Sequence, residues 1–256
     1  MVLKEETGSV SASAHNQYLL SGLVVAQIAL SLALLITAGL FLRTLKQASE
    51  ADLGFDRTHV LLASVDLRTS GYSGSDARAF HRRLLAKLAQ LPGVTSAALS
   101  DWVPLTLTRG STNAFPEGYV AKLHESLEVR NTSVTAEYFQ TMSIPIAEGR
   151  EFTERDDENA PMVAIVDETM AHHFWPWQYA VGKRMRVYGN WVTVVGVERN
   201  SSHLRMNETP EPIVYLSYFQ FAGPQAIFHL RTRGDPELSA PAVEGAVHEI
   251  NRKLPV

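Results

Sequence analysis

The chain has 256 residues, of which 45% are hydrophobic and 20% charged, with a formal net charge of −4 at pH 7 and no cysteine. The lack of cysteine excludes a disulfide-stabilised miniprotein, a thiolate metal site and a cysteine nucleophile. The slightly acidic balance lacks the basic excess of nucleic-acid-binding proteins, so we expect no nucleic-acid partner.

The N-terminal part of the chain contains one long apolar segment. No Asp, Glu, Lys or Arg occurs between Glu6 and Arg43, and residues 18–42 are almost wholly apolar. As a helix this segment would be about 37 Å long, enough to cross the hydrocarbon core of a bilayer. The leader before it has one Lys and two Glu, unlike the basic start of a secretory signal. We therefore predict a leader at 1–17, a retained transmembrane helix at 18–42 and a large domain at 43–256.

Four small residues of this helix, Gly22, Ala26, Ala29 and Ala33, fall within about 60° of one another at 100° per residue. Such a smooth stripe favours packing against another membrane helix. The alternative is that Ala and Gly are simply common in membrane helices.

The residues leave the orientation of this helix open. Arg43, Lys46 and Arg57 follow the apolar segment and only Lys4 precedes it, which would place the large domain in the cytosol. The lack of cysteine in the large domain favours the opposite side, because it suits export.

Two similar units are predicted near the two ends of the large domain. In the first, strands at 59–67 and 94–100 flank a helix whose apolar stripe is Phe80, Leu84, Leu88 and Leu91. In the second, a strand at 225–231 precedes a helix whose stripe is Val243, Val247, Ile250 and Leu254. We interpret them as two halves of one α/β lobe at about 56–105 and 222–256. The second half would lack its last strand, so we expect the chain to be a fragment.

The stretch between these halves, about 106–221, is predicted to be a small insertion rich in β-strands. Short β-type runs occur at 127–134, 162–166 and 212–216, and Gly189-Asn190 indicates a hairpin between 184–188 and 191–197. Residues 135–139 and 167–175 read as short helical segments. The predicted fold class is therefore α+β, with one transmembrane helix before the domain.

Catalytic and metal-binding motifs are weak. Residues 181–184 (Val-Gly-Lys-Arg) lack the upstream glycine and the following Ser/Thr of a P-loop, so we expect any ATPase to be another chain. His172 and His173 point about 100° apart on a helix and have no metal-ligand spacing around them. We predict that the chain is not an enzyme and has no cofactor or metal.

Two further clusters have ordinary interpretations. The acidic group Glu151, Glu154, Asp156, Asp157 and Glu158 lacks calcium-loop spacing and is predicted to be a solvated loop. The aromatic group could form a binding surface, but we expect core or interface packing for its members, which are Trp175, Trp177, Tyr179 and Trp191.

Residues 23–55, LVVAQIALSLALLITAGLFLRTLKQASEADLGF, resemble the helix and juxtamembrane stretch that open the periplasmic core domain of MacB/FtsX-type ABC transporter permeases. The likeness is greatest to the duplicated orphan permeases of that group. Further blocks follow in the family's order at 56–66, 80–97, 138–152, 163–175, 182 with 194–197, 212–218 and the final helix. Two features depart from the family: residues 11–17 replace the usual basic residues before the helix, and the helices expected after the domain are absent.

The resemblance implies a cytosolic leader, one spanning helix in a bacterial inner membrane and an extracytoplasmic domain. It also implies a separate ABC ATPase, the remaining permease helices or a second permease half, and an envelope protein as partners. The domain would then transmit ATP-driven conformational change across the membrane. The alternative functions are a membrane-anchored sensor or ligand-binding module and, third, a tethered hydrolase.

Overall fold

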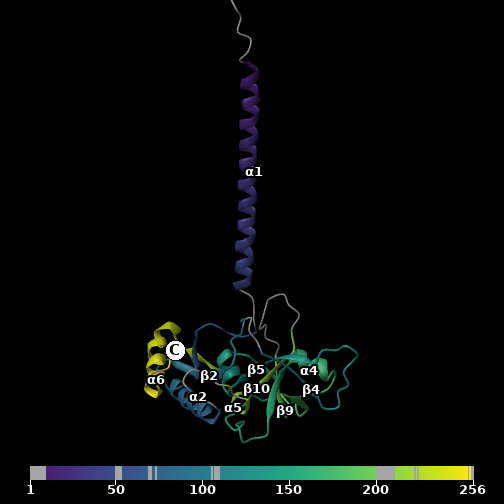
Figure 1. Ribbon diagram of the computed structural model, residues 1–256, viewed down its shortest axis with the longest axis vertical. Coiled ribbons are helices and arrows are strands. Elements are labelled where there is room, and N and C mark those ends of the chain that lie inside the picture. The colour runs from purple at the N-terminus through teal and green to yellow at the C-terminus, as the bar shows by residue number, and fades with distance from the viewer. Residues whose placement is uncertain are drawn as a thin grey trace, which may run out of the picture. The chain divides into compact units, whose positions relative to one another are not determined.

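The computed structural model describes residues 10–49, 54–68, 71–72, 74–104, 106, 110–199, 211–221, 223, 225–252 and 254. The chain forms two compact units, Met1–Ala51 and Asp52–Val256 (Figure 1). The first contains a long helix, and the second is a mixed α+β domain, as predicted.

The described part of the first unit is helix α1 (Val10–Ser49), which runs beyond both ends of the predicted segment 18–42. Its stretch Leu20–Lys46 is 27 residues long, with a mean hydropathy of 2.3 and exposed side chains. The hydroxyls of Thr37 and Thr44 donate to carbonyls one turn earlier, so both are satisfied within the helix. By length and composition, α1 is able to cross a membrane.

One sheet runs through the second unit in the order β1-β11-β2-β5-β10-β7-β9-β8-β4, with β3 paired to β5 and β6 to β9. Its strands are β1 (Val60–Asp66), β2 (Val94–Ser100), β3 (Gly110–Asn113), β4 (Phe115–Pro116), β5 (Glu128–Val134), β6 (Ile146–Gly149), β7 (Val163–Asp167), β8 (Arg184–Val187), β9 (Asn190–Glu198), β10 (Ile213–Ser217) and β11 (Gln225–Thr232). Its helices are α2 (Gly74–Leu88), α3 (Tyr138–Met142), α4 (Glu168–Phe174), α5 (Tyr218–Phe221) and α6 (Ala240–Ile250), with a 3₁₀ turn at Pro236–Ser239.

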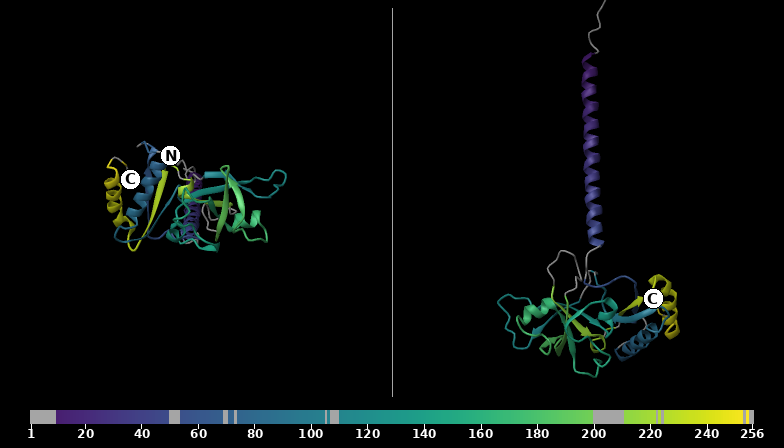
Figure 2. Two further views of the ribbon diagram at one scale, coloured as in Figure 1. Left: turned by 90° about the horizontal axis from the view of Figure 1, so that it is seen from below. Right: turned by 180° about the vertical axis from the view of Figure 1, so that it is seen from behind.

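The two chain ends of the domain form one α/β lobe, as predicted. β11 lies between β1 and β2 and is antiparallel to both. Helices α2 and α6 lie side by side over one face of these strands (Figures 1 and 2), joined by a Lys87–Glu249 ion pair. In the described residues, the outer edge of β1 carries no strand.

The core of this lobe comes from the predicted stripes. The buried face of α2 contributes Phe80, Leu84 and Leu88. These side chains lie in one apolar cluster with Phe228 and Leu230 of β11. Val243 and Val247 of α6 join the same cluster, and Leu254 is buried beyond the end of that helix. Full burial of one such Leu or Phe stabilises the fold by about 1.5–3 kcal/mol.

The middle of the chain is richer in strands, as expected, but α5 at Tyr218–Phe221 was not predicted. The β8–β9 hairpin turns at Tyr188-Gly189, one residue earlier than the predicted Gly189-Asn190, because Val187 pairs directly with Asn190. Both turn residues have positive φ, 50° and 79°, as a two-residue type I′ turn requires. The sequence signal missed this register because tyrosine seldom adopts that backbone conformation.

Asp167, at the end of β7, is a buried carboxyl that joins two elements. Its Oδ1 accepts hydrogen bonds from the backbone N–H of Met170 in α4 and of Ile213 in β10, each at 2.9 Å. Burial, with a further contribution from nearby Glu198, raises the pKa of Asp167 to about 7. The folded domain therefore holds this proton more tightly than the unfolded chain does.

We predict that Asp167→Asn removes a pH dependence of stability. Because the folded-state pKa lies above the ordinary value, this group lowers stability as pH rises from about 4 to about 7. The variant should therefore gain stability relative to the wild type across that range. Urea unfolding of the full chain in detergent, followed by tryptophan fluorescence, measures it, since all four tryptophans lie in the domain.

Asp76→Asn, at an exposed position in the first turn of α2, is the matched control. It should leave the fall in stability from about pH 4 to about pH 7 in place. A difference between Asp167→Asn and wild type that does not change with pH would contradict the prediction.

Candidate functional site

A dense group of polar contacts lies where the chain enters the domain. The backbone N–H of Asp56 donates to the carbonyl of Met142 at the end of α3, at 2.9 Å. The Asp56 carboxylate accepts from the N–H and the hydroxyl of Thr58 at 2.8 and 2.6 Å. These bonds fix the path of residues 56–58 into β1.

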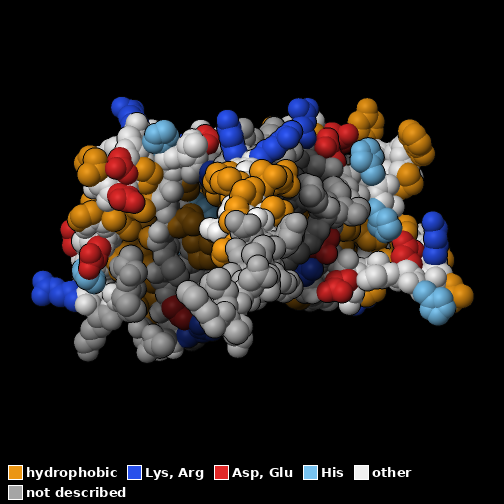
Figure 3. All heavy atoms as spheres, turned by 90° about the horizontal axis from the view of Figure 1, so that it is seen from above, with side chains coloured by type: hydrophobic (Ala, Val, Ile, Leu, Met, Phe, Trp, Pro, Cys, Tyr) orange, Lys and Arg blue, Asp and Glu red, His pale blue; other side chains and the backbone are white. Residues whose placement is uncertain are grey.

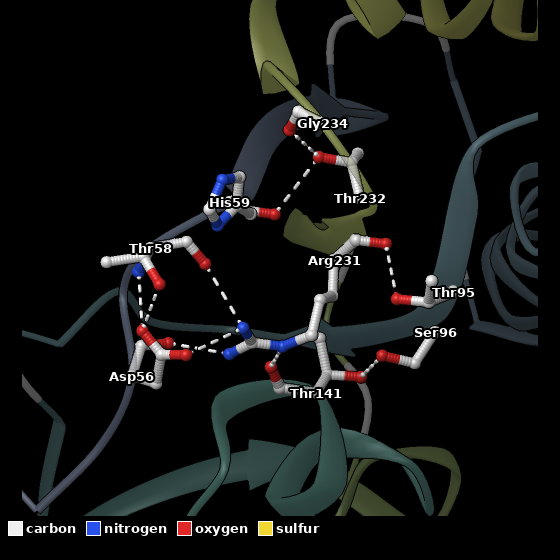
Figure 4. A network of polar contacts seen from close by, with 9 residues as sticks. All are labelled: Asp56, Thr58, His59, Thr95, Ser96, Thr141, Arg231, Thr232 and Gly234. Atoms are coloured by element: carbon white, nitrogen blue, oxygen red, sulfur yellow. Dashed lines mark hydrogen bonds and ion pairs between the residues drawn. The ribbon is translucent and has the colours of Figure 1, made fainter.

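Arg231, on β11, holds this entry segment (Figure 4). Its guanidinium donates to the Asp56 carboxylate at 3.0 Å and to the carbonyls of Asp56 and Thr58 at 2.7 and 3.1 Å. Its Nε donates to the carbonyl of Thr141 in α3 at 2.7 Å. One side chain therefore links the entry segment, β11 and α3; we call Asp56, Thr58, Thr141 and Arg231 the Arg231 cluster.

Neighbouring contacts extend the cluster into the sheet (Figure 4). The Thr141 hydroxyl donates to the hydroxyl of Ser96 on β2 at 3.1 Å, and the N–H of Thr232 donates to the carbonyl of His59 at 2.8 Å. His59 has a left-handed φ of 57°, which costs energy for a residue other than glycine and marks a constrained turn.

Charge in the Arg231 cluster is balanced. The Thr58 hydroxyl, with a smaller contribution from Arg231, holds the pKa of Asp56 below its ordinary value, so both partners are ionised at neutral pH. The Arg231 side chain is 18% exposed, so its charge-assisted bonds are largely shielded from water. The bonds of the cluster hold the entry segment against β11 and α3.

A second polar group joins the α/β lobe to the β-rich insertion. β2 and β5 share one strand pairing, Ser100 with Val134, and the carboxylate of Asp101 accepts from Thr132 and Ser133 of β5 at 2.8 and 2.9 Å. Burial raises the pKa of Asp101, although these hydrogen bonds favour its charged form. Hydrogen bonds of the Asp101 side chain thus add to the short β2–β5 pairing, and we call this junction of the α/β lobe with the insertion the seam.

His229 lies beside this seam on the β11 face that also carries Arg231. Its Nε2 is 2.7 Å from the hydroxyl of Ser100, whose proton is donated to the carbonyl of Trp102, so Nε2 carries the imidazole proton. Burial lowers the pKa of His229 to about 3, and the ring is neutral. Its Nδ1 is buried and makes no hydrogen bond.

An apolar groove of about 170 Å³ adjoins the Arg231 cluster. It is lined by residues of the entry segment, β1, β11, α3 and the loop after β2, which are Phe55, Arg57, Val60, Leu62, Val103, Pro104, Met142 and His229. The groove could take a small apolar group.

The predicted helix-packing residues, Gly22, Ala26, Ala29 and Ala33, lie on α1 with exposed side chains. Their role in packing stays a prediction. His173 Nε2 lies 3.0 Å from Glu125 Oε1, and in the part of the chain that the structure describes, no group of three or more candidate ligands could hold a metal.

Two expectations are wrong in detail. Asp156 is buried rather than solvated, because it accepts two hydrogen bonds from Arg150 at 2.7 and 2.9 Å and one from the Thr153 N–H. In the aromatic group, Trp175 is buried, as expected for core packing. Trp177 is fully exposed and Tyr179 is largely exposed, so core packing does not account for them.

The Arg231 cluster was missed by the sequence reasoning. Arg231 is the last residue of the predicted strand 225–231, where a polar residue commonly faces solvent. The one signal was strand alternation, which places Arg231 on the same face as His229, opposite Phe228 and Leu230.

Comparison with known proteins places the chain. Residues 21–250 match the profile of the MacB-like periplasmic core domain. The periplasmic region of MacB from Actinobacillus actinomycetemcomitans superposes with a TM-score of 0.52 at 15% identity, over 78% of this chain and 87% of that one. The extracellular domain of the noncanonic ABC-type transporter YknZ from Gram-positive bacteria gives 0.48 at 13%, over 75% and 95%. A domain of a putative permease from Porphyromonas gingivalis gives 0.45 at 16%, over 77% and 87%, and no curated protein sequence matched.

The fold is thus a mixed α+β periplasmic-core fold that follows one long apolar helix. The chain belongs to the family of MacB-like periplasmic core domains. Its large unit is therefore a periplasmic or extracellular domain of a MacB-like ABC transporter permease, and a non-catalytic one, as predicted. A periplasmic domain lies on the side of the membrane that the lack of cysteine favours.

We predict that Arg231→Gln destabilises the domain by about 1–3 kcal/mol, because bonds from a charged donor to three backbone carbonyls are weakened or lost. Asp56→Asn should cost less, because the Asp56 side chain is 44% exposed. The double variant should show a coupling energy of about 0.5 kcal/mol or more in urea unfolding.

Arg130→Gln provides the matched control, because Arg130 pairs with Glu211 at 2.7 Å on an exposed part of the β-rich insertion. Its loss should change stability by less than about 1 kcal/mol. Fully additive effects of Arg231→Gln and Asp56→Asn would show that the two side chains do not act together.

Proposed function

We propose that this domain transmits ATP-driven movement of the permease helices to the extracytoplasmic side of the membrane. The single observation that supports this role is the Arg231 cluster, which ties the segment that follows α1 in the chain to the central strand of the α/β lobe. Force on the entry segment would reach β11, β2 and α3 through bonds rather than through a flexible loop.

The proposal includes the organisation of the chain. Residues 1–17 form a cytosolic leader, 18–42 cross the bacterial inner membrane and 43–256 form the extracytoplasmic domain, with the insertion at about 106–221. The partners are a separate ABC ATPase, further permease helices or a second permease half that packs on Gly22, Ala26, Ala29 and Ala33, and an envelope protein. The likeness to duplicated orphan permeases belongs to the same proposal.

We predict that the full chain stays in the membrane pellet after alkaline carbonate extraction, because α1 carries a mostly apolar stretch without a charged residue from Leu20 to Leu42. Leu30→Arg should reduce insertion, at a cost of about 2.5–3.5 kcal/mol on translocon scales. Leu30→Ala is the matched control and should remain in the pellet. Intact wild-type chain in the supernatant would contradict a membrane span.

The transmission role predicts that ATP changes the distance between the α/β lobe and the lipid surface, because the lobe follows α1. The natural chain has no cysteine, so a spin label on Leu238→Cys, at an exposed position of the lobe, reports this distance against spin-labelled lipid headgroups. We expect ATP to shift the distance distribution in vesicles that contain the ABC ATPase co-purified with the chain. Arg231→Gln should reduce the shift without loss of membrane insertion, whereas Arg130→Gln should leave it unchanged.

A ligand-binding module is the second candidate, and the groove beside the Arg231 cluster is the observation that favours it. In that case the distance distribution would respond to a small apolar compound and not to ATP. An unchanged distribution with ATP, in vesicles whose ATPase is active, would therefore contradict transmission.

A further inference from the structure

Two loops of the β-rich insertion display large apolar side chains to solvent. Trp177 is 102% exposed and Tyr179 79% exposed in the loop after α4, while Val120 and Leu123 are 87% and 88% exposed in the loop between β4 and β5. We call these four residues the apolar tip. Scattered surface leucines are ordinary, but a fully exposed tryptophan with an exposed tyrosine in one loop, and two further exposed apolar side chains in a loop anchored at the same helix, indicate an interaction surface.

The two loops are held together, so the tip is a built feature. Tyr119 packs edge-to-face on Phe174 of α4, with ring centroids 5.1 Å apart. The Tyr119 hydroxyl donates to Glu125 Oε1 at 2.7 Å, and the same oxygen lies 3.0 Å from His173 Nε2 on α4. The loop with Val120 and Leu123 is therefore anchored at the helix from which the Trp177 loop continues.

The backbone presents Trp177 outward. Trp175 is buried, and its carbonyl accepts from the N–H of Gln178 at 3.1 Å, which closes a tight turn around Trp177. Trp177 has a left-handed φ of 63°, a costly conformation for a bulky residue. Lys183 donates to the Gln178 side chain at 2.7 Å and braces the turn. Figure 3 shows hydrophobic side chains exposed beside histidines at the right-hand end of the face that it views.

The length of the chain keeps the start of the domain near a membrane. Helix α1 continues for seven residues beyond the predicted span at 18–42, about 10 Å, and the five residue steps from Ser49 to Gly54 add at most about 18 Å. If α1 crosses the bilayer, as the proposed function requires, the domain cannot leave the vicinity of the lipid surface. Trp and Tyr are the side chains enriched at the membrane–water interface, where an apolar ring and a polar atom are both accommodated.

We propose that the apolar tip docks on the lipid bilayer, with Trp177 and Tyr179 in the headgroup region and Val120 and Leu123 against the upper acyl chains. The proposal rests on the membrane anchor of the proposed function. A lipid contact gives the domain a second attachment besides α1, so movement of the helix tilts the domain about the tip instead of displacing it freely.

The test uses the full chain in nanodiscs whose lipids carry bromine near the top of the acyl chains, which quenches tryptophan fluorescence at short range. We expect quenching of the wild type and its loss in Trp177→Ala, whose exposed position leaves the fold intact. Trp191→Phe, at a half-exposed tryptophan on β9 that stacks under Arg184, is the matched control and should retain the quenching.

A relocated reporter makes the test specific. Leu238→Trp in the Trp177→Ala background puts an exposed tryptophan on the α/β lobe, and we expect no quenching there. Quenching of this variant equal to the wild type would overturn the proposal, because lipid contact would not be particular to the tip. Absence of quenching in the wild type would also overturn it and would favour a protein partner at the tip. Either outcome is distinct from failure of the membrane anchor, which carbonate extraction detects.

Discussion

The α/β lobe depends on the two faces of β11. One face carries Phe228 and Leu230, which join the apolar core under α2 and α6, and the other carries His229 and Arg231. Because successive side chains of a strand point to opposite faces, the same eight residues bury an apolar layer and place polar groups next to the entry segment. A one-residue slip of β11 would exchange the two faces and put a guanidinium and an imidazole into the core.

Periodicity in the sequence predicted the apolar face well. The stripes of α2 and α6 repeat at helical spacing, so the helices, their buried faces and the pairing of the two chain ends followed from residues such as Leu84 and Val247. The polar face could not be predicted in this way. Arg231 binds carbonyl oxygens of residues 56, 58 and 141, and backbone carbonyls have no sequence signature. Such a site depends on tertiary placement alone.

Side-chain burial was hardest to predict where composition is uniform and the backbone is irregular. Trp175 and Trp177 are two residues apart in an aromatic segment, yet one is buried and the other fully exposed, because the turn after α4 reverses the chain between them. Asp156 was taken with its acidic neighbours, yet Arg150 and the Thr153 N–H bind it inside the fold. In both cases a local turn, not residue type, decides the environment, so the exposed Trp177 carried no signal in the sequence.

In the proposed function, the placement of strong and weak connections in the domain determines what movement it can pass on. β1, β11 and β2 share long antiparallel ladders, so the α/β lobe should move as one body when the entry segment moves. β2 and β5 share one pairing, and hydrogen bonds of Leu99 and Asp101 with residues 132–135 reinforce that seam. Arg231 also binds α3, and Arg82 of α2 pairs with Glu158, so several contacts join the lobe to the insertion. A lipid contact at the apolar tip would therefore act on the whole domain, which would tilt about the tip as the lobe follows α1. The neutral state of His229 fits this view, because a charged imidazole at the seam would need water that a closed interface excludes.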